Sequence, residues 1–209
     1  MTRDNWVLDL RKCLTPEEVG RLRRTAKKHA LAALATGART SVRDRFVLEL
    51  ALATGLRVME IVQLRCGDLL IDRHEDALIV RQGKGGRRRL VRFSTEFANL
   101  CQEHLLWKEG AGEPTDAEAP LLMSSNTGGP LTTRAVQKAF KRCAARAGLP
   151  PRYSIHCLRH TYACALYKAS GYNLRLVQKQ LGHARIATTQ VYADVMDPDV
   201  RRALERLYA

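Results

Sequence analysis

The chain has 209 residues, 45% of them hydrophobic, which is enough to bury a core as one domain or at most two small ones. With 35 Lys and Arg against 21 Asp and Glu its formal net charge is +14, which favours a polyanionic partner, most commonly nucleic acid, over a merely solvated basic surface. The sequence shows no signal peptide, membrane-length apolar run, CxxC pair or disulfide-framework spacing, so we expect an intracellular protein with six reduced cysteines and no membrane contact.

Two helices and a short third one are predicted in the first third of the chain. Residues 1–12 show no period and are interpreted as an arm or the remnant of a linker. The first helix begins at Thr15, because Pro16 suits the first helical position and Glu18 completes a capping box. The second runs from about residue 41 to residue 54. Gly55 breaks it, and "LRVMEIVQL" resumes as a short helix.

The hydrophobic period then changes from helical to alternating. Three short runs rich in β-branched and aliphatic residues follow one another, namely "DLLID", "DALIVRQ" and "RRLVRF". They are joined by "RHE" and by the glycine-rich "GKGGR". This pattern predicts a three-stranded antiparallel meander.

From residue 95 onward the sequence is again typical of helices. A helix is expected at residues 95–109, followed by a polar loop and, from about residue 132, five more helices. The last, at 197–209, carries an apolar stripe formed by Val200, Ala203, Leu204 and Leu207. The predicted fold class is therefore α+β, mainly helical with a small three-stranded antiparallel β-sheet.

Two candidate functional sites lie in the first half of the chain. Arg57 follows the Gly-Leu break, with Glu60 one turn later on the same helix face, which is also the pattern of an ordinary surface pair. Lys84 lies between glycines in a predicted hairpin turn, where a lysine is often simply solvated. The turn lacks the spacing and the Ser/Thr of a Walker phosphate loop.

Two more candidate sites lie in the second half. In "HCLRH", His156 and Arg159 share one helix face with His160, for which a core position is the plainer interpretation. A zinc site is disfavoured because the HExxH glutamate and a third ligand are missing. In "LGHARIATTQVYADV", His183 follows a helix-ending glycine and Tyr192 comes nine residues later.

Taken together, these residue types suit phosphoryl transfer without a metal or any other cofactor. Arginine forks bind the non-bridging oxygens of a phosphodiester and neutralise the charge that grows in the transition state. A phenol is a poor nucleophile at neutral pH, but cationic surroundings favour its anion and a histidine can accept its proton. A lysine on a hairpin can protonate a leaving oxygen.

The segments "ATGLRVMEI", "GKGGRRR", "HCLRHTYA" and "LGHARIATTQVYA" resemble, in order and spacing, the conserved boxes of the tyrosine recombinase (phage integrase) family. The resemblance covers about residues 14–208. It implies that Arg57, His156, Arg159 and His183 hold the phosphate, that Lys84 is the general acid and that Tyr192 is the nucleophile. Glu60 matches an acidic position that supports the first arginine.

The resemblance also implies a domain organisation and partners. Residues 13–209 would form the catalytic domain, and the helix at 197–209 would dock on its own domain or exchange between protomers. The expected partners are double-stranded DNA, three further copies in a tetramer and accessory DNA-bending proteins, in the cytoplasm at the nucleoid. Most of the family carries a core-binding domain ahead of the catalytic one, so the chain would be a fragment or a short member similar to the single-domain fimbrial-switch invertases.

The leading functional hypothesis is a site-specific recombinase that cleaves and rejoins DNA through a 3′-phosphotyrosine. A type IB topoisomerase uses related chemistry but rejoins the same strand. A DNA-binding regulator would form no covalent adduct. A metal nuclease is disfavoured because the sequence shows no acidic cluster.

Overall fold

The computed structural model describes residues 12–71, 76–81, 88–183 and 189–190. Its helices are α1 Pro16–Ala35, α2 Thr40–Thr54, α3 Val58–Val62, α4 Thr95–Gly110, α5 Thr133–Arg146, α6 Ile155–Ala169 and α7 Leu174–Leu181. Its strands are β1 Leu69–Ile71, β2 Asp76–Val80 and β3 Arg89–Arg92. The expected fold class, mainly helical with one small three-stranded antiparallel sheet, is confirmed.

The first helix begins as the sequence predicts. The Thr15 side chain accepts a hydrogen bond from the backbone N–H of Glu18, and the Glu18 carboxylate accepts one from the backbone N–H of Thr15. This reciprocal pair satisfies two of the N–H groups that a helix start leaves without partners. Tyr153 also donates to Glu18, which ties the start of α1 to the segment before α6.

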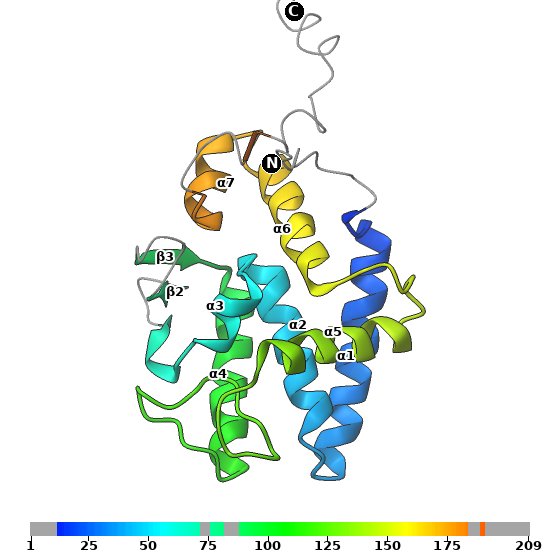
Figure 1. Cartoon of the computed structure of the whole chain (residues 1–209), viewed down its shortest axis with the longest axis vertical. Helices are drawn as coiled ribbons and strands as arrows, with labels where there is room; N and C mark the ends of the chain where they lie inside the picture. The colour runs from blue at the N-terminus through cyan, green and yellow to red at the C-terminus, as the bar shows by residue number, and fades with distance from the viewer. Residues whose placement is uncertain (1–11, 72–75, 82–87, 184–188, 191–209) are drawn as a thin grey trace, which may run out of the picture.

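Helix α2 lies at the centre of the molecule and contacts α1, α4, α5 and α6. Figure 1 shows α1 and α2 side by side, with α5 crossing them. Because neighbours surround α2, two of its carboxylates are buried and paired: Asp44 accepts both hydrogen bonds of the Arg142 fork, and Glu49 accepts from Arg23. Buried charges are tolerated when they are paired in this way.

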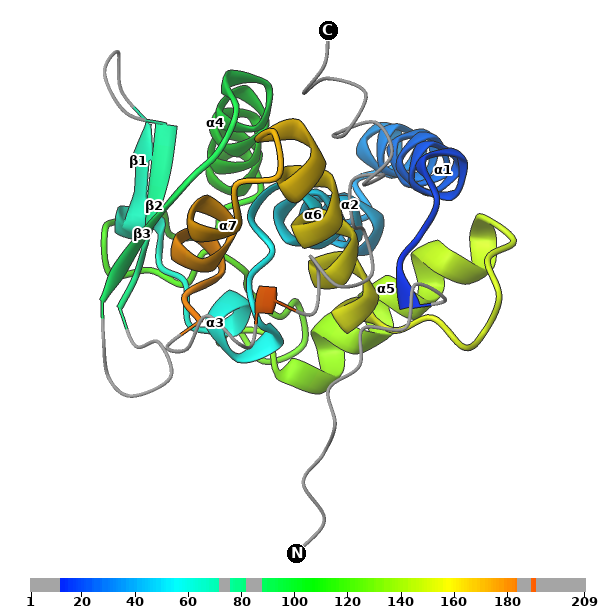
Figure 2. The same cartoon turned by 90° about the horizontal axis from the view of Figure 1, so that it is seen from above.

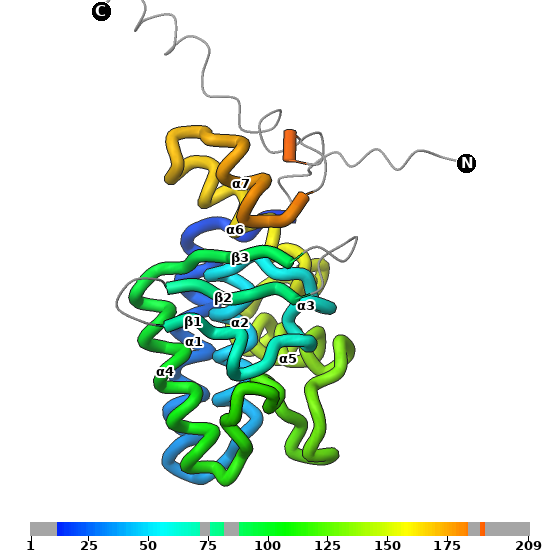
Figure 3. Tube along the Cα trace, turned by 90° about the vertical axis from the view of Figure 1, so that its left-hand side faces the viewer, coloured from blue at the N-terminus to red at the C-terminus, as the bar shows by residue number. Residues whose placement is uncertain are grey.

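The sheet has the order β1-β2-β3 with antiparallel neighbours, which is the meander that the sequence predicts. Leu78 in the central strand pairs with Leu69 on one side and with Val91 on the other. Figure 3 shows the three strands lying side by side next to α4, which contacts β1 and β2. As an edge strand of this sheet, β3 lies next to the site described below.

Helix α7 lies between α6 and β3, as the view from above shows (Figure 2). The Gln180 side chain fixes this arrangement: its oxygen accepts from the backbone N–H of Arg92 at 3.2 Å, and its NH₂ group donates to the Arg92 carbonyl at 3.2 Å. The amide thus pairs with the edge of β3 much as another strand would. It places the end of α7 beside Arg92, the last residue of β3.

All six cysteines are free thiols, and five of them are buried. Cys13 is half-exposed, and its sulfur lies 3.4 Å from that of Cys164 on α6, 151 residues later. In the part of the chain that the structure describes, no helix is long and apolar enough to cross a membrane.

Several predicted segments fall outside the described residues. They include the expected arm, of which only residue 12 is described, and the C-terminal helix at 197–209. Of the helix expected at 186–193, only Thr189 and Gln190 are described, and both are helical.

Candidate active site

A helix break places Arg57 at the site. Gly55 ends α2 in the left-handed region, with φ of 61°, and α3 starts at Val58 directly after Arg57. A Cβ added to Gly55 would lie 2.3 Å from Cδ1 of Tyr162, so only glycine allows α6 to approach this closely. The turn therefore presents the Arg57 side chain, which is 30% exposed, next to α6.

Glu60 lies below Arg57 and is not part of an ordinary surface pair, since its side chain is only 4% exposed. It accepts from the backbone N–H of Arg57 at 2.8 Å and from Nη1 of the same residue at 3.0 Å. Both Nη atoms of Arg89 also donate to its two oxygens, at 2.8 and 2.9 Å. Burial alone would raise the pKa of Glu60, but these hydrogen bonds and charges lower it to about 2.

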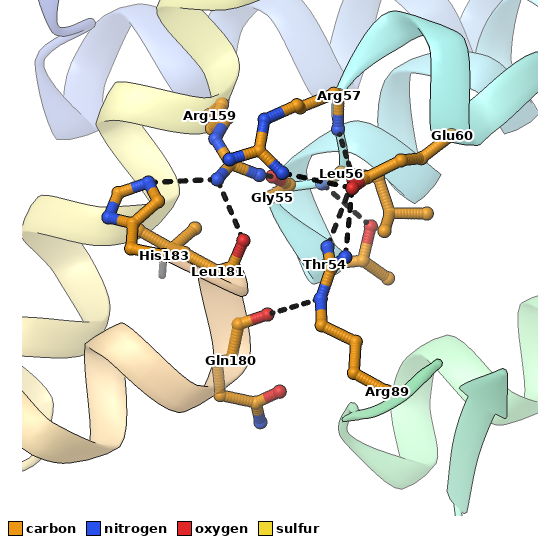
Figure 4. A network of polar contacts seen from close by, with 10 residues as sticks. All are labelled: Thr54, Gly55, Leu56, Arg57, Glu60, Arg89, Arg159, Gln180, Leu181 and His183. Atoms are coloured by element: carbon orange, nitrogen blue, oxygen red, sulfur yellow. Dashed lines mark hydrogen bonds and ion pairs between the residues drawn. The ribbon is translucent and has the colours of Figure 1, made fainter. Parts of the chain in front are cut away.

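Arg159 is buried in the first turns of α6 and is oriented by three described contacts. One Nη atom donates to the carbonyl oxygen of Gly55, and the other donates to the carbonyl oxygen of Leu181 at 2.8 Å and contacts Nε2 of His183 at 3.0 Å. Figure 4 shows this network between the end of α2, α6 and the end of α7. The guanidinium is therefore fixed by two helix-ending turns.

His183 follows directly after Gly182, which ends α7 in the left-handed region with φ of 64°. Its ring lies between Nη2 of Arg159 and the hydroxyl of Thr189, which is 2.9 Å from Nδ1. Burial, followed by the positive charges of Arg159, Arg57 and Arg89, lowers the pKa of His183 to about 3. The imidazole is therefore neutral at physiological pH, so it lies close to these arginines without electrostatic repulsion.

His156 and His160 lie in the same helix as Arg159. His156 is exposed in the first turn of α6, and burial together with the charge of Arg159 lowers its pKa. His160 is half-buried, and burial followed by neighbouring positive charges lowers its pKa to about 4. The imidazole of His160 is therefore neutral at physiological pH. Among the described residues, no three His, Cys, Asp or Glu side chains come together as metal ligands.

Of the seven residues singled out from the sequence, four meet in one polar network, and they are Arg57, Glu60, Arg159 and His183. His156 lies three residues before Arg159 on the same helix, in the first turn of α6. Lys84 and Tyr192 lie outside the described residues.

Two members of the network were missed by the sequence reasoning, namely Arg89 and Thr189. Arg89 is the last of three consecutive arginines, and such a run carries no signal that separates one from the others. Thr189 lies in a polar segment before Tyr192, but its side chain is fully buried and contacts His183.

The arrangement suits an oxygen-rich anion. It presents two guanidinium groups held in fixed orientations and a neutral ring. Guanidinium forks match the planar pairs of oxygens of a phosphate. Because the donors are already oriented, little reorganisation is needed when negative charge develops on such oxygens.

Comparison with known proteins identifies the family of this chain. The phage integrase family matches residues 12–198 of the chain. Tyrosine recombinase XerC of Xanthomonas axonopodis pv. citri (strain 306) is 36% identical over 162 residues, covering 78% of this chain and 50% of that protein. XerC of Xylella fastidiosa (strain 9a5c) is 38% identical over 151 residues, covering 72% of this chain and 48% of that protein.

The same fold occurs in a solved recombinase structure. The XerH site-specific recombinase bound to a palindromic difH substrate superposes with a TM-score of 0.75 at 23% identity, covering 99% of this chain and 56% of that one. The chain spans about half the length of the curated relatives it matches. With a family match that extends over residues 12–198, the chain belongs to the phage integrase family.

Proposed function

We propose that this chain carries the catalytic part of a site-specific DNA recombinase, which cleaves and rejoins DNA strands through a covalent 3′-phosphotyrosine. The net charge of +14 supports a DNA partner, and the site-specific recombinase XerH, which shares the fold, was solved bound to its palindromic difH substrate. On this proposal the protein acts at the nucleoid. The observation that carries it is the fixed pair of guanidinium groups around the Gly55 and Gly182 turns.

The proposed reaction is two successive transfers at one phosphorus atom. The phenolic oxygen of Tyr192 attacks the phosphorus and gives up its proton to His156. The bond from phosphorus to the 5′-oxygen breaks, and Lys84 gives a proton to that oxygen. A 5′-hydroxyl of another strand then attacks the phosphotyrosine and gives its proton to Lys84, while His156 returns a proton to the departing oxygen of Tyr192, which restores the phosphodiester and the side chains. The ester linkage is kept throughout, so the reaction needs neither ATP nor an oxidant.

The described residues of the site have distinct parts in this scheme. Arg57 and Arg159 bind the non-bridging oxygens and stabilise their charge in the transition state. His183, which the resemblance expects at the phosphate, contacts Nη2 of Arg159 through Nε2 and thereby orients that guanidinium toward the phosphate. His156 is exposed at the start of α6, and burial together with the charge of Arg159 lowers its pKa, so we assign it the proton of Tyr192.

The proposal is tested with nicked duplexes of randomised sequence, in which cleavage near the nick releases a short strand and traps the covalent product. The unaltered chain is expected to give a DNA adduct on a denaturing gel. Tyr192→Phe is expected to give none while still binding DNA, and Tyr172→Phe, at an exposed position in the turn between α6 and α7, serves as the matched control. Absence of an adduct from the unaltered chain contradicts the proposal.

A second readout separates the recombinase from a topoisomerase. Adducts formed on one duplex are supplied with a second duplex that has a free 5′-hydroxyl. Joining to the second strand is expected. Adduct formation with rejoining only to the original strand, together with relaxation of supercoils, would favour the topoisomerase.

The domain organisation is part of the same proposal. Residues 1–12 act as an arm or linker and residues 13–209 as the catalytic domain. The capping box at Thr15 and the hydrogen bond from the backbone N–H of Leu14 to the hydroxyl of Thr161 support a boundary close to residue 13. Limited proteolysis tests it, with cleavage expected before residue 14 and not within α1.

The proposed assembly is a ring of four copies on DNA, in which the helix at 197–209 of one copy docks on the next. A groove of about 870 Å³ supports it, lined by α1, α2, α4 and α6 and floored by half-buried apolar side chains, among them Val19, Leu52, Leu100 and Leu166. Arg45 lines the same groove, and its Nε is buried without a hydrogen-bond partner among the described residues. An apolar helix with acidic residues at its start, Asp197 and Asp199, complements such a groove.

Mixing two deficient copies tests whether the helix docks on a neighbour. One copy lacks residues 197–209, and the other keeps them but carries Leu100→Glu in the groove. Each alone is expected to bind DNA without forming synaptic complexes on native gels. The mixture is expected to recover a two-copy complex, because one intact helix meets one intact groove. Normal synapsis by the truncated copy alone, or its failure to fold, would contradict the exchange.

A further inference from the structure

Arg89, at the start of β3, is one of the two residues of the network that the sequence patterns do not explain. Its side chain is 13% exposed, and its two Nη atoms each donate to one oxygen of Glu60, at 2.8 and 2.9 Å. This two-pronged pairing is the strongest geometry that an arginine and a carboxylate adopt. It joins the sheet to α3 across 29 residues of sequence.

The same side chain also contacts the turn that presents His183. Nε of Arg89 donates to the carbonyl oxygen of Gln180 at 3.4 Å. Its aliphatic stem packs on Gly182, where an added Cβ would lie 2.7 Å from both Cδ and Nε of Arg89. Gly182 therefore supplies a left-handed turn and also the space that Arg89 occupies. Figure 4 shows Arg89 between Glu60 and Gln180.

Glu60 links Arg89 to Arg57, because its carboxylate accepts hydrogen bonds from both residues. Each of its oxygens accepts one hydrogen bond from Arg89 and one from Arg57, so four donors meet one carboxylate. An ionised carboxylate has about four lone-pair positions, and all are then used. Rotation of the carboxylate to suit another position of Arg57 would break a contact with Arg89.

We propose that Arg89 is a positioning residue for the strand-transfer reaction: through Glu60 it fixes the guanidinium of Arg57, and through the α7 turn it fixes His183 relative to Arg57. Arg89 does not itself touch the DNA. This inference rests on the proposed function. On this proposal, β3 supports both α3, which follows Arg57, and the turn at the end of α7, which presents His183.

A direct phosphate contact by Arg89 is the competing explanation, and the geometry disfavours it. Three of its five N–H groups are already directed at Glu60 and Gln180, and the side chain is mostly buried. Arg57, by contrast, is 30% exposed and has only one Nη on Glu60. Arg57 is thus the fork that is open to a ligand, and Arg89 is the one that holds the carboxylate.

The test compares Arg89→Met, which keeps an aliphatic stem, with Arg88→Met at the exposed neighbouring position. With saturating nicked duplex, Arg89→Met is expected to slow adduct formation about tenfold or more, while DNA affinity stays within about twofold. Arg88→Met is expected to leave the rate at saturation unchanged. A slowed rate that saturating DNA restores would assign Arg89 to DNA binding and overturn the proposal.

A double-substitution cycle shows whether Arg89 acts through Glu60. Arg89→Met and Glu60→Gln are made alone and together. If Arg89 acts through Glu60, the combined variant is expected to be no slower than the slower single variant, because both changes remove the same support. Full multiplication of the two effects contradicts that route.

The pH profile gives a readout that a loss of general stability would not produce. In the native protein, burial raises the pKa of Glu60 and Arg89 is the first of the groups that bring it down to about 2. Without Arg89 the pKa rises, so Glu60 takes up a proton as the pH falls. Adduct formation by Arg89→Met is therefore expected to decline between about pH 8 and about pH 5 more steeply than that of the native chain. The combined variant, which has no Glu60 carboxyl group, is expected to lose this extra decline.

One measurement separates this proposal from the proposed function. The carboxyl carbon of Glu60 is titrated by NMR without DNA in the native chain and in Arg89→Met, or in Arg89→Lys if the methionine variant does not fold. A higher pKa in the variant is expected even if no DNA adduct ever forms. An unchanged pKa in a folded variant overturns the positioning proposal, whereas the absence of adducts from the native chain overturns the proposed function alone.

Discussion

Nη2 of Arg159 lies 3.0 Å from Nε2 of His183. A guanidinium has only donors, so Nε2 must accept, and the proton of the neutral ring is on Nδ1. Nδ1 in turn donates to the hydroxyl of Thr189 at 2.9 Å. One buried threonine therefore selects the tautomer in which His183 is joined to Arg159.

Thr189→Val is expected to slow adduct formation about tenfold, because a buried donor without a partner costs about 1–3 kcal/mol and the favoured tautomer is lost. Thr189→Ser keeps the hydroxyl and should retain most of the rate. Single-turnover kinetics on nicked duplex measure both. Equal rates for the valine and native proteins would show that the tautomer does not matter.

The stability of the fold should depend on pH through its buried histidines. A histidine of the unfolded chain titrates near pH 6.5, whereas the pKa of His183 is lowered to about 3. As the pH falls below about 6.5, the unfolded chain takes up a proton that the folded chain does not, so stability present above that pH is progressively lost. The urea midpoint is therefore expected to fall between about pH 7.5 and about pH 5.

His183 should account for part of that decline. Burial also lowers the pKa of His104 to about 3 and that of His160 to about 4, and both contribute in the same direction. His183→Gln is expected to make the decline shallower, and His29→Gln on α1 is the matched control. An equally steep decline in His183→Gln would mean that His183 is not buried in the neutral form.

Substitution of either fixed arginine, Arg57 or Arg159, should slow DNA cleavage, whereas substitution of a surface arginine should not. Arg57→Ala and Arg159→Ala are each expected to slow cleavage by about two orders of magnitude, since a preorganised donor contributes about 3 kcal/mol to the transition state. Lysine at either position should restore little of the cleavage rate, because lysine lacks the planar guanidinium fork. Arg146→Ala, in the last turn of α5, is the control. Near-native cleavage by either lysine variant would contradict a two-pronged phosphate contact.

What the sequence predicted correctly depended on local signals. The capping box of Thr15 and Glu18 and the break at Gly55 involve neighbours within a few residues, and the structure has both. The pairing of Arg57 with Glu60 is likewise local, three residues apart. The sequence therefore predicts correctly the elements that carry Arg57, Glu60 and Arg159.

What the sequence did not predict depended on distant partners. Arg89 is 29 residues from Glu60 and 91 from Gln180, and Arg142 is 98 from Asp44. No period or spacing marks such pairs, so the burial of Glu60 and the central position of α2 could not be foreseen. A charged residue in a helix pattern is normally assigned to solvent, and only the fold shows which ones are enclosed.

The role of Lys84 as general acid stays a prediction from the sequence. Lys84→Ala is expected to slow cleavage of ordinary DNA and to be largely relieved by a 5′-phosphorothiolate at the scissile position, because a sulfur leaving group needs no proton. The rates on the two substrates are compared by denaturing gel. Lack of relief would make Lys84 a binding residue and place the general acid elsewhere.

The central claim is that DNA becomes joined to one tyrosine of this chain. The adduct trapped on nicked duplex is digested with protease and nuclease, and the nucleotide-bearing peptide is identified by mass spectrometry. The account predicts a 3′-phosphoryl nucleotide on Tyr192, within the segment "IATTQVYADV". A nucleotide on another residue, or a 5′-phosphoryl linkage, would contradict it.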